Sequence, residues 1–221
     1  MSEAPVDVRV WDLPTRVFHW LLVALVGLQW ASGEFRLLPM QWHYRLGYAT
    51  LALVVFRVAW GFAGSDTSRF AQFVRGPGAV LRHLASVFRG ERVRHAGHNP
   101  LGGWSVLLML ASIALQAVSG LFTSDDISEE GPLVAHVATA TVHGMTRIHH
   151  LCPTVLLVLI VLHVAAVLGH RVFGGDDLIT PMLHGRARLE HPPRLRFAPT
   201  WLALLLLAAS AAAVWTLLAV F

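Results

Sequence analysis

The sequence predicts an all-α membrane protein, built as a four-helix transmembrane bundle followed by a fifth transmembrane helix at its C-terminal end. Composition is the first reason. Of the 221 residues, 55% are hydrophobic and only 14% are charged, whereas soluble domains average about 25% charged residues. Segmentation is the second reason, because the apolar residues gather in blocks of about 20, the length that a helix needs to cross a bilayer.

Five apolar blocks give predicted helices over residues 16–32, 43–63, 101–122, 149–172 and 199–221. Local signals support these boundaries, because Asn99 and Pro100 suit the N-cap and the first turn of the third helix. We expect residues 1–188 to form the bundle, with a loop at 64–100 between its second and third helices. Residues 189–221 are expected to form a linker and the extra helix.

The 17 basic residues are distributed unevenly among the connections. Most of them precede the first helix or lie in the loops 64–100 and 173–198, whereas the other connections are richer in acidic residues. By the positive-inside rule, the basic side faces the cytoplasm, so the N-terminus is cytoplasmic and the C-terminus, after five crossings, lies outside. This placement gives the Arg residues a role in topology, and we expect membrane lipid rather than nucleic acid as a partner.

Four of the 13 histidines lie inside or at the ends of predicted helices: His19, His43, His149 and His163. An ionisable side chain in a membrane helix indicates a functional site. The 14 residues from His149 to His163 correspond to about 1400° of rotation and about 21 Å of rise. Both rings therefore share one helix face at two depths. His150 is about 140° away from His163 on the helix, so we expect His150 to be interfacial.

The predicted topology groups these histidines into two pairs. His19 and His163, the inner pair, lie in the cytoplasmic half, and His43 and His149, the outer pair, lie in the other half. Two imidazoles that face each other across a flat macrocycle are the axial ligands that a b-type haem needs, and bundle cores hold such sites. We therefore expect two haems b, which transfer single electrons because both axial positions of each iron are filled.

The inner pair is less well matched in depth than the outer pair. His19 is one turn from the start of its predicted helix, whereas His163 is about 13 Å from the end of its own. We expect helix tilt, or a longer first helix, to absorb this difference. Zinc is the rival metal, but it prefers three or four ligands that converge on one point.

Arg57 follows His43 by the same 14 residues, so it points along the same face of its helix at the depth of the inner pair. Since a buried unpaired Arg is costly, we expect it to meet a propionate or another anionic group of the inner haem. The remaining histidines of loops and helix ends are expected to be solvated or interfacial: His83, His95, His98, His136, His143, His170, His184 and His191.

Several segments resemble the bacterial cytochrome b561 and nickel-hydrogenase-type cytochrome b subunits. The matching segments include 11–20 (WDLPTRVFHW), 43–47 (HYRLG), 97–103 (GHNPLGG) and 162–166 (LHVAA). The similarity covers roughly residues 8–188, and the fifth helix lies beyond it.

This resemblance implies a dihaem cytochrome b in a bacterial inner membrane. It implies His19 and His163 on the inner haem, and His43 and His149 on the outer haem. It also implies a quinone or quinol as one redox partner. The other partner would be a periplasmic c-type cytochrome, a hydrogenase or another oxidoreductase subunit. The oligomeric state is left open.

The function expected from the sequence is therefore single-electron transfer across the membrane, as an electron-transfer component of an oxidoreductase. Two alternatives stay open. The chain could be a stand-alone superoxide:quinone oxidoreductase, with Arg45 and Arg147 guiding the anion to the outer pair. It could also be a non-redox membrane protein that binds another metal or serves as an anchor.

Overall fold

The computed structural model describes residues 5–91, 95–174, 176–190 and 193–220. The long helices are α1 (Leu13–Phe35), α2 (Met40–Ala63), α5 (Pro100–Gly120), α6 (Thr139–Gly169) and α8 (Thr200–Val220). The short helices are η1 (Asp66–Ser68), α3 (Phe70–Phe73), α4 (Pro77–Phe88), η2 (Val134–His136), the π-helical η3 (His170–Gly174) and α7 (Ile179–His184). The strands are β1 (Val6–Arg9) and β2 (Arg186–Leu189).

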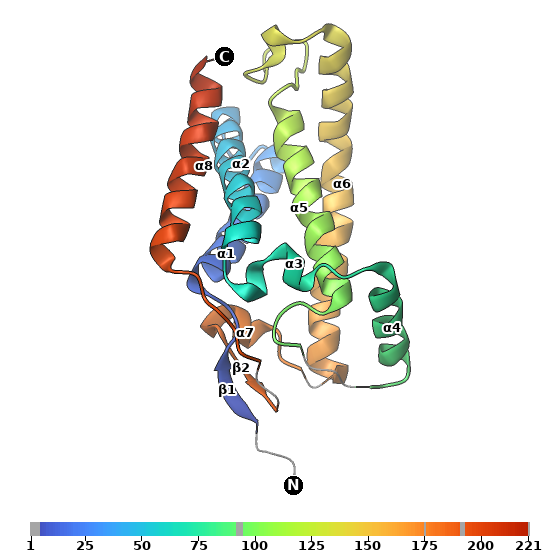
Figure 1. Ribbon diagram of the computed structural model, residues 1–221. Helices are drawn as coiled ribbons and strands as arrows, with labels where there is room; N and C mark the ends of the chain where they lie inside the picture. The colour runs from blue at the N-terminus through green and yellow to red at the C-terminus, as the bar shows by residue number, and fades with distance from the viewer. Residues whose placement is uncertain (1–4, 92–94, 175, 191–192, 221) are drawn as a thin grey trace.

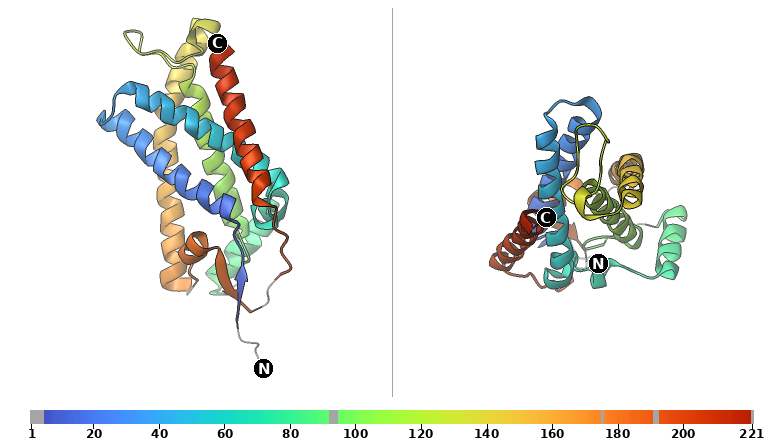
Figure 2. Two further views of the ribbon diagram at one scale, coloured as in Figure 1. Left: turned by 90° about the vertical axis from the view of Figure 1, so that its left-hand side faces the viewer. Right: turned by 90° about the horizontal axis from the view of Figure 1, so that it is seen from above.

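The long helices form a bundle in which α1 packs on α2, α5 packs on α6, and α2 also contacts α5 (Figure 1). The C-terminal helix α8 lies against α2 and touches α1. In the view turned by 90°, α1 and α2 run obliquely across α6 (Figure 2, left).

Four described helical segments are long and apolar enough to cross a membrane: Met40–Ala63, Pro100–Gly120, Thr139–Phe173 and Thr200–Val220. The predicted all-α membrane bundle with an added C-terminal helix is thus confirmed. The predicted first span, α1, has 23 residues but does not meet the same standard of apolarity. It carries the polar side chains of Arg16, His19 and Gln29, which reduce its hydropathy.

The predicted helix starts agree with the structure except in α6. Asp12 caps α1, with Oδ1 accepting a hydrogen bond from Thr15 N at 2.7 Å, and Asn99 caps α5 through Gly102 N at 2.7 Å. By contrast, α6 begins at Thr139, so His149 lies well inside it and not at its start. The prediction followed the apolar run, but a helix continues beyond that run wherever its backbone bonds are satisfied. Pro153 lies within α6, one turn after His149.

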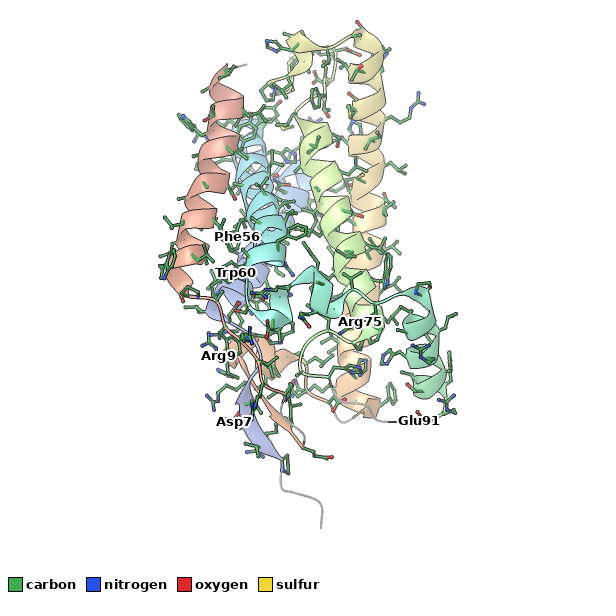
Figure 3. All side chains as sticks on the ribbon, viewed as in Figure 1. Asp7, Arg9, Phe56, Trp60, Arg75 and Glu91 are labelled. Atoms are coloured by element: carbon green, nitrogen blue, oxygen red, sulfur yellow. The ribbon has the colours of Figure 1, made fainter. Side chains whose placement is uncertain are left out.

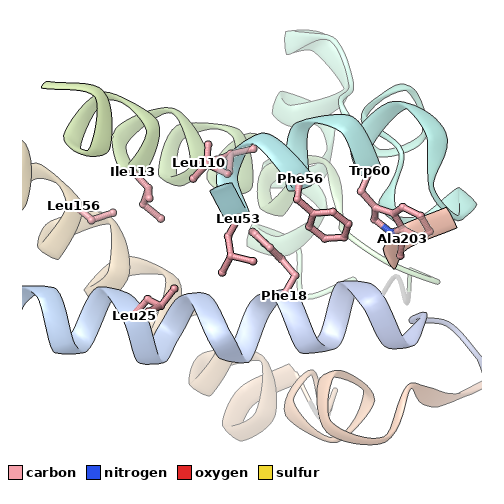
Figure 4. Packing of buried hydrophobic residues seen from close by; sticks show 10 residues of the cluster. Phe18, Leu25, Leu53, Phe56, Trp60, Leu110, Ile113, Leu156 and Ala203 are labelled. Carbon is pink, nitrogen blue, oxygen red and sulfur yellow. The ribbon is translucent and has the colours of Figure 1, made fainter. Parts of the chain in front are cut away.

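The apolar core lies between the long helices and joins α1, α2, α5, α6 and α8 (Figure 4). Its buried members are Phe18, Leu25, Leu53, Val54, Phe56, Trp60, Leu110, Ile113, Leu156 and Ala203. Because α8 contributes to this cluster, the added helix is part of the folded core.

A two-stranded ribbon closes the end of the bundle at which the N-terminus lies (Figure 1). β1 and β2 pair antiparallel, and the register places Val6 opposite Leu189. β2 therefore runs through the predicted boundary between bundle and linker. The linker is also fixed to η1, because Arg196 N donates to Asp66 Oδ2 at 2.8 Å.

The same end carries most of the Arg residues. Arg9 on β1 and Arg75 after α3 both lie toward this end, below Trp60 of α2 (Figure 3). The α5–α6 connection and the end of α8 lie at the opposite end (Figure 1). The cytoplasmic position of the basic end stays a prediction. His191, which was expected to be solvated or interfacial, lies outside the described residues.

Candidate functional site

The outer pair comes together at the end of the bundle that carries the α5–α6 connection. His43 lies in the first turn of α2 and His149 lies in α6, and their ring centroids are 6.2 Å apart with planes at 82°. Two imidazoles on opposite sides of one metal atom, each with a metal–nitrogen bond of about 2 Å, have centroids about 6 Å apart. The separation of these rings therefore suits axial ligation of one iron. His150, the rejected neighbour, is exposed.

Each ring of the outer pair is held through Nδ1. Nδ1 of His43 lies 2.9 Å from Ser32 Oγ, near the end of α1. Nδ1 of His149 lies 3.0 Å from the Gln116 carbonyl and 3.3 Å from Ser119 Oγ, near the end of α5. In metal sites, a histidine that binds through one nitrogen characteristically donates its other N–H to such oxygens. Sequence analysis identified the histidines and missed Ser32, Gln116 and Ser119.

The inner pair is less enclosed by hydrogen bonds. His163 acts electrostatically on His19, so the two rings lie near each other across α1 and α6. The His19 ring packs edge-on against Trp20, with centroids 4.9 Å apart. Its Nδ1 is buried and has no hydrogen-bond partner among the described residues.

Arg57 is buried, with only 3% of its surface exposed. Its guanidinium lies 5.1 Å from the ring centroid of Phe70 and 6.0 Å from that of Phe18. Nη1 has no hydrogen-bond partner among the described residues, and Asp12 is the acidic group that acts on Arg57 electrostatically. A buried cation with an unused donor suits an anionic group such as a haem propionate.

His98, predicted to be solvated or interfacial, is half-buried. Its ring packs between Trp11, at 4.9 Å, and Phe73, at 4.7 Å, and its Nδ1 is buried without a partner among the described residues. Loss of water, with smaller contributions from the charges of Arg57, His163 and His19, lowers the pKa of His98 to about 3. Position in a loop before α5 suggested exposure, but the segment folds back under the bundle.

A buried polar network lies beneath the inner pair, centred on the fully buried Asp12. Asp12 Oδ2 accepts hydrogen bonds from Trp60 Nε1 and from Ser68 Oγ, each at 3.3 Å. Thr15 Oγ1 lies 2.6 Å from Ser68 Oγ and accepts from Trp60 Nε1 at 3.2 Å. The network joins α1, α2 and η1 and fixes the start of the helix that carries His19.

The donor set fits a haem better than it fits a small metal ion. Within the described residues, no group of three or more His, Cys, Asp or Glu side chains converges on one point, as zinc would require. Instead, imidazoles meet in pairs between helices, and buried polar atoms of His19, Arg57 and Gln116 remain without partners among the described residues. Fold and site together define a membrane-embedded helical bundle of the type that binds haem.

Comparison with known families gives this class a name. The family model described as prokaryotic cytochrome b561 matches residues 10–185, and the chain belongs to this family. None of the curated proteins compared with the chain matches it. The protein is therefore a multi-pass membrane cytochrome of the b type, a family that binds haem b and takes part in electron transfer. The resemblance noted in the sequence is confirmed.

Proposed function

We propose that the protein binds two haems b and carries single electrons across the membrane between a quinone or quinol and a redox partner at the outer face. His43 and His149 would hold the outer haem, and His19 and His163 the inner haem. The observation that carries the proposal is the outer pair, in which the ring centroids of His43 on α2 and His149 on α6 are 6.2 Å apart. Nδ1 of each ring is hydrogen-bonded, so Nε2 would bind iron, with the Gln116 amide that lies 3.2 Å from Nε2 of His149 moved aside.

A haem supplies reversible one-electron chemistry, and the chain's own residues would do the remaining work. Each pair of imidazoles would hold one haem and would leave its iron no open site for oxygen. Arg57 would face the propionates of the inner haem, and the apolar core between the pairs would exclude water. The rise between His149 and His163 on α6 is about 21 Å, and the macrocycles shorten the remaining gap between the sites.

Family membership and the resemblance support a quinone as one partner and a bacterial inner membrane as the location, with the N-terminus cytoplasmic and the C-terminus periplasmic. The periplasmic partner would be a c-type cytochrome, a hydrogenase or another oxidoreductase subunit. Surrounding lipid would contact the exposed apolar faces of α6 and α8.

The ligand assignment is tested by counting haems. We expect His43→Ala and His149→Ala each to lower the haem content from two per chain to one, measured as the pyridine haemochrome of the purified protein. His150→Ala is the matched control, because it removes an exposed histidine next to His149 and should leave two haems. Two haems in His43→Ala, or one in His150→Ala, would contradict the assignment.

A second candidate function, oxidation of superoxide at the outer haem, is favoured by one observation. Arg45 and Arg147 are both exposed and lie two residues from His43 and His149, respectively. A double Arg45→Gln, Arg147→Gln variant should oxidise superoxide more slowly and with less dependence on salt, since the steering charges are gone. Unchanged rates in this variant, measured by pulse radiolysis, would remove this candidate.

A further inference from the structure

The same five-residue pattern occurs at the outer ends of α1 and α5. Residues 29–33 read QWASG and residues 116–120 read QAVSG. Each copy lies on the helix that precedes a helix with an outer histidine: α1 precedes α2, and α5 precedes α6. The pattern is too short to be noticed from sequence alone, but both copies make the same contacts.

In each copy, the serine bonds to the glutamine of its own helix and to a histidine of the next. Ser32 Oγ donates to the Gln29 carbonyl at 2.8 Å and lies 2.9 Å from His43 Nδ1. Ser119 Oγ donates to the Gln116 carbonyl at 3.1 Å and lies 3.3 Å from His149 Nδ1. The Gln116 carbonyl also lies 3.0 Å from His149 Nδ1, so the second copy offers the ring one more acceptor.

These contacts determine which ring nitrogen carries the hydrogen. A serine hydroxyl has one hydrogen to donate, and in both copies the glutamine carbonyl accepts it. The serine oxygen can therefore only accept from Nδ1–H. At His149 a further contact agrees, since the Gln116 side-chain Nε2, which has only hydrogens to offer, lies 3.2 Å from Nε2 of the ring. Both outer rings therefore present a lone pair at Nε2, and the Gln116 amide has to turn aside for a metal.

The glycine of each copy lets the ring lie close to the helix. A Cβ atom on Gly33 would lie 3.4 Å from His43 Cε1, and one on Gly120 would lie 2.9 Å from His149 Cε1. An alanine at position 120 would therefore force the ring to shift. An alanine at Gly27, also on α1, would meet nothing within 4 Å.

We propose that Gln29, Ser32 and Gly33 and their counterparts Gln116, Ser119 and Gly120 are two copies of one positioning device for the outer haem. It holds His43 and His149 in the Nδ1–H tautomer, sets the angle between the ring planes and lowers the midpoint potential of the iron. The potential falls because an Nδ1–H···O bond makes the imidazole a stronger donor, which stabilises ferric iron. The inference rests on the proposed function, since it requires these histidines to be ligands.

The test uses the full chain purified in detergent, with redox titration and EPR of the oxidised protein as readouts. We expect Ser32→Ala to keep two haems, to raise the midpoint potential of the outer haem and to change its low-spin EPR signal. That signal depends on the angle between the imidazole planes. Ser119→Ala should give a smaller rise, because the Gln116 carbonyl still accepts from Nδ1 at 3.0 Å. Ser32→Thr keeps the hydroxyl, so the midpoint potential of its outer haem should equal that of the unsubstituted protein.

Ser210→Ala is the matched control. Ser210 is a buried serine whose Oγ likewise donates to a backbone carbonyl of its own helix, that of Leu206 at 2.7 Å, but α8 carries no histidine. Its substitution should leave both potentials and both EPR signals unchanged. Ser32→Ala and Ser119→Ala proteins with two haems and unaltered outer potential and EPR would overturn the proposal. Loss of the outer haem alone in Ser32→Ala would support it.

If Ser32→Ala loses both haems, the proposal is tested instead by substitution of the glycines. Gly120→Ala should alter the EPR signal of the outer haem, whereas Gly27→Ala should not, and no difference between these variants would overturn the proposal. Failure of the proposed function is recognised separately, because the unsubstituted protein would then lack two haems b, or His43→Ala would retain the outer one.

Discussion

At the outer end of the bundle, His43 has a hydroxyl beside Nδ1, and His149 has a hydroxyl and a carbonyl beside it. At the inner end, Nδ1 of His19 has no hydrogen-bond partner among the described residues, and the charges of Arg57, His163 and His19 all act on His98. If each pair holds a haem as proposed, the outer environment would act on its iron through hydrogen bonding, and the inner environment would act through charge. Hydrogen bonds to ligands favour ferric iron, whereas a nearby cation favours ferrous iron. The comparison predicts a higher midpoint potential for the inner haem.

The largest effect should come from removing the carboxylate beneath the inner pair. Asp12→Ala leaves Thr15 N without its acceptor, and it removes one of the two partners of Trp60 Nε1 and of Ser68 Oγ, which keep Thr15 Oγ1. Since a buried donor left unpaired costs about 1–3 kcal/mol and each further hydrogen bond lost costs about 1 kcal/mol, we expect the free energy of unfolding to fall by about 3 kcal/mol. Thermal unfolding in detergent, followed by Soret absorbance, would measure this. Asp7→Ala is the control, because it breaks an exposed ion pair worth about 1 kcal/mol at most.

A smaller effect should appear as pH dependence. The pKa of His98 is about 3 in the folded protein, against an ordinary value of 6.5. Between these values the unfolded chain binds a proton that the folded chain does not, so the free energy of unfolding falls as the pH falls. From pH 7 to pH 5 we expect a loss of about 2 kcal/mol from this group. His98→Gln should remove this part of the slope, as measured by unfolding midpoints. An identical slope in both proteins would show that His98 is protonated normally.

The smallest effect, and the most direct test of the comparison, concerns Arg57. Arg57→Met keeps an unbranched side chain and removes the charge, so reduction of the inner haem should become less favourable by about 1 kcal/mol. Redox titration should show the inner potential falling and the outer one nearly constant. Equal shifts at both haems would mean that Arg57 does not lie preferentially at the inner site.

Sequence patterning was sufficient for most of the helices and for placing His43 beside His149, because both depend on period and length. The 14-residue spacing of His149 and His163 follows directly from helix geometry. Sequence patterning was not sufficient for the start of α6. Hydropathy marks the segment that contacts lipid, whereas the helix itself extends as far as its backbone hydrogen bonds are satisfied.

The contacts around the histidines could not be predicted from the sequence either. His98 is half-buried because its loop places the ring between Trp11 and Phe73, and no local pattern in the sequence indicates this contact. Ser32 and Ser119 look like ordinary helix residues until their neighbours across the bundle are known. The pentapeptide that surrounds each of them is too short to be noticed in the sequence, and only the contacts give the similarity a meaning.

Pro153 of α6 has a mechanical consequence for the two sites. Proline has no amide hydrogen, so the carbonyl of His149, one turn earlier, lacks its usual helical donor. The turn that bears His149 can therefore bend relative to the segment that bears His163. If the two pairs hold haems as proposed, a displacement of one ring during oxidation or reduction would be absorbed at this joint instead of being transmitted as strain to the other site.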